Sequence, residues 1–268
     1  MRRIALYSDI HGNTTALAAV LADLEANGPA ERYCLGDLVG YGPDPAGVIE
    51  MVRATGDPVI RGNYDQGVGD QSGSCGCYYA TEQAVSDGAA SYAFTERSVG
   101  DADAQWLLSL HTEIRLEEAG VRVLLTHGSP RRINEYLMPD RGEKQLARLA
   151  GEAQADVVCC GHVHIPYHRS FRVDPDDTGS PLVHYVNSGS VGKPKDGDPR
   201  ACWVELLIGT ADEVGAAAAD DHYAALAGST NTWVGLVIRR VSYDVESVAG
   251  AVIAAGLPAT LAEALRTA

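Results

Sequence analysis

The chain has 268 residues, 46% of them hydrophobic and 21% charged, which is ordinary for a globular protein and sufficient for a sizeable core. Its formal net charge of −15 would repel a phosphate backbone, so we do not expect sequence-independent binding to long nucleic acids. A small phosphorylated substrate remains compatible, because bound cations can reverse the charge in one cleft. We find neither the core of a signal peptide nor about 18 consecutive apolar residues, so we expect a cytoplasmic protein without a membrane span.

Short strand-like runs alternate with amphipathic segments, a pattern that predicts an α/β layer architecture. Three strands are expected in the first sixty residues, at 3–7, 32–35 and 58–60. The helix after the first strand should begin at Asn13 or Thr14. The helix after the second strand should begin behind Asp44 and end at Gly56.

The next segment, 66–110, begins rich in Gly and Ser and then turns helical without a strand signal. Its last helix should be capped by Asp101 or Asp103. We expect this segment to form a lid or cap on a single domain that spans 1–268. Later strands are expected at 113–116, 121–125, 156–160, 167–173, 182–186, 201–208 and 232–241, with a turn at 118–120. Later helices are expected at 144–153 and 245–265.

Side chains that can bind metal ions directly follow five of the expected strands: Asp9, His11, Asp37, Asn63, His127, His162 and His164. Because the carboxyl ends of strands in an α/β sheet form a common crevice, five separate segments could deliver these ligands to one place. The spacing of two within 9–11 and within 162–164 would put both side chains on the same side of an extended backbone. Each of these pairs could therefore bind one ion.

Carboxylate, imidazole and amide ligands together suit borderline divalent ions better than Mg²⁺ alone. We therefore expect two ions, with Mn²⁺ or Fe favoured and Zn²⁺ as a further option. Two ions roughly 3.5–4 Å apart, bridged by a carboxylate, could activate a hydroxide and hold both the entering and the leaving oxygen in phosphoryl transfer. The pattern predicts a dimetal phosphoesterase.

Five motifs resemble those of the calcineurin-like metallophosphoesterases in order and spacing across roughly residues 1–195: DIHGN at 9–13, GDLVGYGP at 36–43, GNYD at 62–65, THG at 126–128 and GHVH at 161–164. The resemblance implies a four-layer α/β/β/α sandwich of two mixed sheets flanked by helices. It assigns one metal to Asp9, His11 and His164. It assigns the other metal to Asn63, His127 and His162, with Asp37 as the bridge and a shared hydroxide that attacks phosphorus in line.

Tyr64 departs from the pattern of the family, in which many members have a histidine at this place that helps to stabilise the transition state or to protonate the leaving group. A phenol with a pKa near 10 is a weaker general acid than an imidazole. The small bacterial phosphodiesterases of the family often lack this histidine too. We therefore expect a phosphodiesterase of this branch that acts on cyclic or linear nucleotide diesters, with Asn63, His127 and Tyr64 as the catalytic candidates.

Other enzymes of the same chemistry remain open, namely a phosphomonoesterase, including a protein Ser/Thr phosphatase, or a dinucleoside polyphosphate hydrolase. A scaffold of the same fold without catalysis is a further alternative, but such proteins typically lose ligands and all seven are present here. The sequence does not identify the oligomeric state, and it assigns no role to the acidic insert at 210–221.

Several residues near the motifs have further candidate roles. Arg61, Arg131 and Arg132 could bind a substrate phosphate bidentately, although exposed arginines are common. The six cysteines show no disulfide framework, and Cys75 and Cys77 lack a partner pair, so we expect reduced and mostly structural thiols. The segment 187–190 follows an expected strand and could shape the floor of a cleft or form a plain turn.

Overall fold

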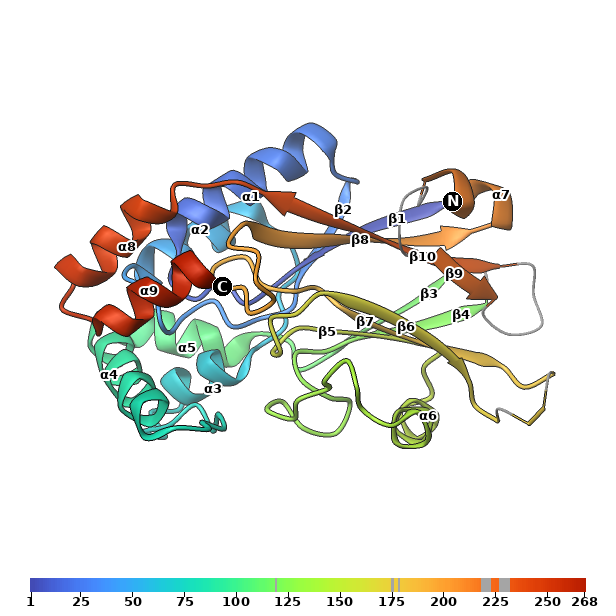
Figure 1. The fold of residues 1–268 in the computed structure, drawn as a ribbon, viewed down its shortest axis with the longest axis horizontal. Coiled ribbons are helices and arrows are strands. Elements are labelled where there is room, and N and C mark those ends of the chain that lie inside the picture. Colours follow the sequence, from blue (N-terminus) through green and yellow to red (C-terminus); the bar gives the residue numbers. More distant parts are fainter. Residues whose placement is uncertain (119, 175, 178, 218–222, 227–231) are drawn as a thin grey trace.

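Two mixed five-stranded sheets lie face to face in the computed structural model, which describes all residues except 119, 175, 178, 218–222 and 227–231 (Figure 1). The first sheet has the order β2-β1-β8-β10-β9 and contains Glu31–Cys34, Arg2–Tyr7, Ala201–Gly209, Trp233–Val241 and Tyr223–Leu226. The second has the order β3-β4-β5-β7-β6 and contains Ile114–Glu118, Val121–Leu125, Val157–Cys160, Leu182–Asn187 and Tyr167–Arg172.

Both sheets place parallel strands beside antiparallel ones. Strand β1 is parallel to β2 and antiparallel to β8. In the second sheet β4, β5 and β7 are parallel to one another, and β3 and β6 pair antiparallel at its two edges. The carboxyl ends of parallel strands are the usual place for a ligand site in such sheets.

The alternation of side chains along the strands produces the layers. Ile4 and Leu6 face the second sheet and share an apolar cluster with Val123 and Val157. The intervening residue Ala5 faces the opposite way, toward the helices α1 (Thr14–Asn27) and α2 (Pro45–Thr55). On the outer face of the second sheet, β4 and β5 pack against α6 (Glu143–Glu152). This arrangement confirms the expected four-layer sandwich.

Most of the expected helix ends are confirmed by their caps. Asn13 caps α1 by accepting a hydrogen bond from the Ala16 N–H at 2.9 Å, and Asp44 caps α2. Helix α2 ends at Gly56, whose φ of 70° lies in the left-handed region. The expected cap of α5 (Asp101–Ser109) by an aspartate is wrong, because Gly100 is the cap residue. Asp101 and Asp103 lie within the first turn, where a carboxylate stabilises the helix dipole.

The segment 66–110 contains helices and no regular strand in the structure, namely the end of α3 (Asn63–Gly69), α4 (Glu82–Ser98) and α5. The strand expected at 58–60 is reduced to single bridges from Val59 to Cys34 and from Ile60 to His111. Pro58 has no N–H with which to extend a ladder.

The C-terminal segment folds into the helices α8 (Val245–Ala254) and α9 (Ala259–Thr267), which lie at the same end of the molecule as α3 and α4 (Figure 1). They pack against each other and against Phe94 of α4. Part of the acidic insert forms α7 (Ala211–Ala217), and its residues 218–221 lie outside the described residues, as does position 119 in the expected turn. In the described chain no helix combines the length and apolar character needed to cross a bilayer.

Candidate metal centre

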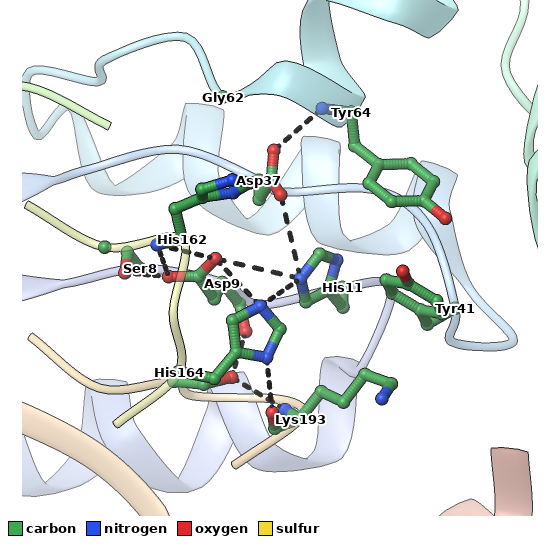
Figure 2. A network of polar contacts seen from close by, with 12 residues as sticks. Ser8, Asp9, His11, Asp37, Tyr41, Gly62, Tyr64, His162, His164 and Lys193 are labelled. Carbon is green, nitrogen blue, oxygen red and sulfur yellow. Dashed lines mark hydrogen bonds and ion pairs between the residues drawn. The ribbon is translucent and has the colours of Figure 1, made fainter. Parts of the chain in front are cut away.

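The seven predicted ligands lie in the loops behind the carboxyl ends of β1, β2, β4 and β5, and at the start of α3. Six of them form two groups, and within each group the ligand atoms lie within 4.8 Å of one another. The first group consists of Asp9, His11 and His164, and the second of Asp37, His127 and His162. Figure 2 shows most of these side chains converging from separate loops.

Asp37 and Asn63 complete the expected arrangement. The Asp37 Oδ2 atom lies 3.4 Å from His127 Nε2 and 3.8 Å from His11 Nε2, so this carboxylate faces both groups. The Asn63 Oδ1 atom lies 3.0 Å from His127 Nε2 and therefore belongs with the second group. These positions fit a bridging role for Asp37 and an amide ligand at Asn63.

Backbone carbonyls fix the orientation of three of the four imidazoles. The Nδ1 atoms of His11, His127 and His164 lie 2.9, 2.8 and 2.6 Å from the carbonyl oxygens of Val39, Leu35 and Lys193, respectively. A carbonyl oxygen only accepts hydrogen bonds, so each Nδ1 carries a proton and Nε2 is the atom that points into the site. This is the usual support of a histidine that binds a metal ion.

In the described part of the chain, the Nε2 atoms of three ligand histidines lack good hydrogen-bond donors, as expected of atoms that bind a metal ion. His162 Nε2 is buried and has no hydrogen-bond partner among the described residues. In the first group the Nε2 atoms of His11 and His164 face each other at 3.1 Å. Two imidazole nitrogens and a carboxylate at such distances would be poorly compensated without a cation between them. The residues present therefore fit divalent ions.

The backbone at the ligands differs from the expectation of an extended chain. Asp9, His11, His162 and His164 have φ values of 53°, 50°, 67° and 62°, in the left-handed region. Asp9 and His11 do lie in one group, but His162 and His164 lie in different groups. The expectation that each pair binds one ion is therefore wrong for the second pair. Alternation of side chains applies only to extended backbone, so it explains the position of neither pair.

Neighbouring loops hold the carboxylates in place. Asp65 accepts hydrogen bonds from the N–H groups of Asp37, Leu38 and Gly62, each at 2.9 Å. The Asp9 carboxylate accepts from the Ser8 hydroxyl and, at 3.0 Å, from the His162 N–H (Figure 2). These contacts join the separate loops into one unit.

The segment 187–190 supports the ligand loops through hydrogen bonds. The Ser190 hydroxyl donates to the Asp9 carbonyl at 2.7 Å, and the Asn187 amide donates to the Gly161 carbonyl at 2.6 Å. The hydroxyls of Ser188 and Ser8 lie 2.7 Å apart. The segment is therefore a support for the ligand loops as well as a turn.

Burial and neighbouring charged groups give the four ligand histidines different pKa values. Burial, together with a neighbouring histidine, lowers the pKa of His11 to about 3 and that of His162 to about 4. Burial also places the pKa of His164 well below its usual value. At His127 burial acts in the same direction, but Asp37 outweighs it and raises the pKa to about 9. His127 alone of the four therefore carries a charge at pH 7 in the absence of metal.

Tyr64 lies fully buried behind the ligands. Its N–H donates to Asp37 Oδ1 at 2.8 Å, and its ring packs edge-on against that of His11 with the centroids 5.6 Å apart. Its hydroxyl lies 3.5 Å from that of Tyr79. Burial raises the pKa of Tyr64 well above its usual value, so this phenol is a poor proton donor at neutral pH.

Two of the three predicted arginines bind other groups of the chain with their side chains. The Arg61 guanidinium donates to the Leu108 carbonyl at 2.6 Å. Arg131 donates through two nitrogens to Glu135, at 2.7 and 2.6 Å, and Arg132 is exposed. A role of these arginines in binding substrate stays a prediction.

Two lysines that the sequence analysis did not select lie beside the first group. The His164 N–H at Nδ1 donates to the Lys193 carbonyl, and the Lys195 N–H donates to the His164 carbonyl at 3.2 Å. Lys193 extends from this contact toward Tyr41 (Figure 2). The available signal was their position just behind 187–190, which itself follows a strand.

Cys75 and Cys77 adjoin the second group. The Asn63 Nδ2 atom donates to the Cys75 carbonyl at 2.9 Å and to the Cys77 sulfur at 3.2 Å. Both bonds turn the amide so that its oxygen faces His127. All six cysteines are free thiols, as expected, and these two orient a candidate ligand.

The comparisons with known proteins agree with this fold. The calcineurin-like phosphoesterase superfamily domain matches residues 2–208. Over 214 residues the chain is 32% identical to the uncharacterized protein MJ0912 of Methanocaldococcus jannaschii, an alignment that covers 75% of this chain and 80% of that protein.

Two solved structures resemble almost the whole chain. The metallophosphoesterase from Sphaerobacter thermophilus is 26% identical, with a TM-score of 0.68 and 99% of both chains covered. The hypothetical protein PH1004 from Pyrococcus horikoshii OT3 is 19% identical, with a TM-score of 0.72 and coverage of 99% of this chain and 98% of that one, which shows the fold alone.

A four-layer sandwich with two ligand groups at its strand ends has the fold of a metallophosphoesterase. The chain belongs to the calcineurin-like phosphoesterase family. Membership supports a metal-dependent hydrolase of phosphoric esters, and the two groups suggest a dimetal site.

Proposed function

We propose that this protein is a dimetal phosphodiesterase that acts on small nucleotide-type diesters. The observation that carries the proposal is the set of imidazoles whose Nδ1 atoms are held by backbone carbonyls, so that their Nε2 atoms face two carboxylates. Such an arrangement serves metal ligation and has no other evident use in a buried loop cluster.

We assign one ion to Asp9, His11 and His164, and the other to Asn63, His127 and His162, with Asp37 shared. Two bound ions supply a water nucleophile at neutral pH and neutralise the charge that develops on the phosphoryl oxygens. The residues of the chain would hold these ions in two adjacent groups. Asp65 fixes the backbone of the Asp37 loop, while the Tyr64 N–H and the Ser8 hydroxyl bind the Asp37 and Asp9 carboxylates. Backbone carbonyls fix three of the imidazole rings.

Mn²⁺ and Fe are the favoured ions, with Zn²⁺ as an option. The ligand set combines imidazole nitrogens with carboxylate and amide oxygens, and none of the six cysteines belongs to either group. Such a set suits borderline ions, whereas Mg²⁺ prefers oxygen ligands and retained waters.

The preference for diesters follows from Tyr64. A monoester with a poor leaving group benefits from a proton donor near the leaving oxygen. Tyr64 is buried, its hydroxyl faces Tyr79, and its pKa is raised, so it supplies no such proton at neutral pH. Its contribution is to hold Asp37 through its backbone N–H.

The test compares bis(p-nitrophenyl) phosphate with p-nitrophenyl phosphate on protein stripped with a chelator and reloaded with Mn²⁺. Both substrates release the same leaving group, so their ratio of kcat/KM reports the preference for diester over monoester. We expect the diester to be favoured by about tenfold or more. A preference for the monoester would refute the diesterase assignment, and the absence of both metal-dependent activities would refute catalysis.

We also propose that 66–110 acts as a cap on a single domain spanning 1–268. Two contacts support this. The Asn63 amide is bound by Cys75 and Cys77, and the Tyr79 hydroxyl reaches those of Tyr41 and Tyr64 at 3.4 and 3.5 Å. Both place the segment against the ligands.

A further inference from the structure

A cavity of about 280 Å³ lies beside the metal-ligand groups. Three segments that are distant in sequence line it, namely 78–87, 193–195 and 260–264. None of these belongs to the ligand motifs, and the last lies in α9, beyond the matched family domain. The volume is close to the lower end of small-molecule sites, which begin at about 300 Å³.

Two tyrosines connect this cavity to the ligands. Tyr41 lines the cavity, and its ring lies 4.9 Å from the ring of His11 in the first group. Tyr136 also lines it and stacks on His162 of the second group, with the centroids 4.0 Å apart. A substituent of a phosphoryl group held at the ligands would therefore have the cavity within reach.

The cavity brings two lysines together in an otherwise acidic protein, with one aspartate in the same lining. Lys193 and Lys195 line it, and neither ammonium has an ion-pair partner within the part of the chain that the structure describes. Lys193 Nζ lies 4.7 Å from the centre of the Tyr41 ring. Asp87, which lines the same cavity, instead accepts hydrogen bonds from Gln83 at 2.8 Å and Thr260 at 2.7 Å.

The backbone fixes these lysines relative to the ligands. His164 bonds to the Lys193 carbonyl through Nδ1 and accepts from the Lys195 N–H through its own carbonyl. A lysine fixed in this way suits a second anionic group of a substrate, at a fixed distance from a phosphoryl group held at the ligands. A chain with 36 acidic and 21 basic residues has no general surplus of lysine to explain two together at this place.

The mouth of the cavity offers an aromatic surface. Tyr78 lines it with 77% of its surface exposed, which is unusual for so large a ring. Exposed aromatic faces beside basic groups bind nucleic-acid bases by stacking, in a manner that tolerates different bases.

We infer that this cavity is a nucleotide subsite, in which Lys193 and Lys195 bind a second phosphate of the substrate and Tyr78 stacks on a base. The inference rests on the proposed function, since it places the scissile phosphate at the ligand groups. It narrows the substrate class to short linear nucleotides that bear a phosphate beyond the scissile diester.

The test uses a linear adenylyl dinucleotide with and without a 5′-terminal phosphate. For the wild-type protein with Mn²⁺ we expect kcat/KM to be about tenfold higher for the phosphorylated form, as one charge-assisted contact supplies. In Lys193→Gln and in Lys195→Gln this ratio should fall toward one. The matched control is Lys144→Gln, which removes the same charge from an exposed helix position and should keep the ratio. Metal content should be measured for every variant.

Equilibrium binding of both dinucleotides to the metal-depleted protein gives a readout without catalysis. The terminal phosphate should lower the Kd of the wild type about tenfold and have no such effect in Lys195→Gln. Tyr78→Leu should weaken both dinucleotides alike and keep their ratio, because both carry bases.

The experiments distinguish a failure of the subsite from a failure of the proposed function. Equal kcat/KM and equal Kd for the two dinucleotides in the wild type, with normal hydrolysis of bis(p-nitrophenyl) phosphate, would overturn the subsite alone. A loss of the ratio in Lys144→Gln as large as in Lys195→Gln would overturn it as well. A phosphate-dependent Kd that needs Lys195, in a protein that hydrolyses no diester, would support the subsite and refute the phosphodiesterase.

Discussion

Each of the three imidazoles bonded to a carbonyl presents Nε2 to the site, but their proton affinities differ. His11 and His164 are neutral near pH 7, whereas His127 keeps its charge because Asp37 lies 3.4 Å away. A metal ion needs the neutral form of its imidazole ligand. An ion in the second group therefore competes with a proton for His127. An ion in the first group meets no such competition at His11 and His164.

This competition predicts a pH-dependent affinity for the ion at His127. The pKa of His127 is raised from 6.5 to about 9. Its charged form stabilises the metal-free protein fully below pH 6.5, and this contribution is lost as the pH rises through 9. Metal binding has the opposite dependence, so the apparent affinity of this ion should rise by up to about tenfold per pH unit between pH 6.5 and 8.5.

Titration calorimetry with Mn²⁺ at pH 7.5, in buffers of different ionisation enthalpy, measures this directly. We expect about one proton to be released for the weaker of the two ions. An affinity that does not change across this pH range would contradict the assignment of His127 as a charged ligand.

Gly161 illustrates how close the loops approach. A Cβ atom at this position would collide with the side chains of Ser8 and Asp9. Gly161→Ala should therefore displace the Asp9 carboxylate and remove at least about one of the two bound metal ions per chain. Elemental analysis measures this metal content. Gly142→Ala is the matched control, because nothing lies within 4 Å of the added atom. Full metal content in Gly161→Ala would contradict the need for this close approach in metal binding.

At the scale of elements, α3 supports the loop behind β2. Asp65 accepts four backbone N–H hydrogen bonds and is buried. Asp65→Asn replaces one acceptor oxygen by a donor that faces N–H groups, so the loop of Asp37 should loosen. We expect metal affinity to fall about 10–100-fold, as for other supports of metal ligands. Asp70→Asn, on an exposed residue at the end of the same helix, is the control and should leave the affinity unchanged.

The proposed role of the segment 66–110 as a cap on the domain leads to a different prediction. Thr81 caps α4 by accepting a hydrogen bond from the Ala84 N–H at 3.1 Å. Thr81→Ala should destabilise the start of this helix by about 1 kcal/mol, and so loosen one wall of the cavity. We expect the ratio of kcat/KM between large and small diesters to change while Mn²⁺ affinity is kept. An equal loss in both would contradict the role of the segment as a cap.

The elements were largely predictable because their signals are local. Four of the five strands expected before the ligands follow from periodicity, and the caps at Asn13 and Asp44 follow from polar residues at the helix starts. The sandwich follows from the resemblance of the five motifs. The assignment of the ligands to two ions stays a prediction, which the grouping of side chains supports.

Other features depend on contacts between distant segments, which a single sequence does not reveal. The left-handed backbone of His162 and His164 is imposed by the packing of loops, so alternation gave the wrong pairing. The hydrogen-bond partner of the Arg61 side chain is the Leu108 carbonyl, 47 residues along the chain. Lys193 and Tyr78 become neighbours of one cavity only through the fold.

At the scale of the whole molecule, the net charge of −15 opposes the approach of an anionic substrate. Salt screens this long-range repulsion, while short contacts inside the cavity are screened less. We therefore expect kcat/KM for a multiply charged dinucleotide to rise about two- to fivefold from about 20 to about 200 mM KCl. Bis(p-nitrophenyl) phosphate has a single charge and should respond less. A decrease with salt for both substrates would show that local cations dominate their approach.

The left-handed conformation of the ligand residues has an evolutionary consequence. Asp9, His11, Asp37, His162 and His164 occupy a backbone region that glycine adopts more easily, at a cost of about 1 kcal/mol or more each. A laboratory population selected only for heat resistance in the presence of a chelator would gain by exchanging these residues for glycine. Such a lineage would lose its metal centre first and keep its sandwich, because these five side chains lie in loops outside the strands.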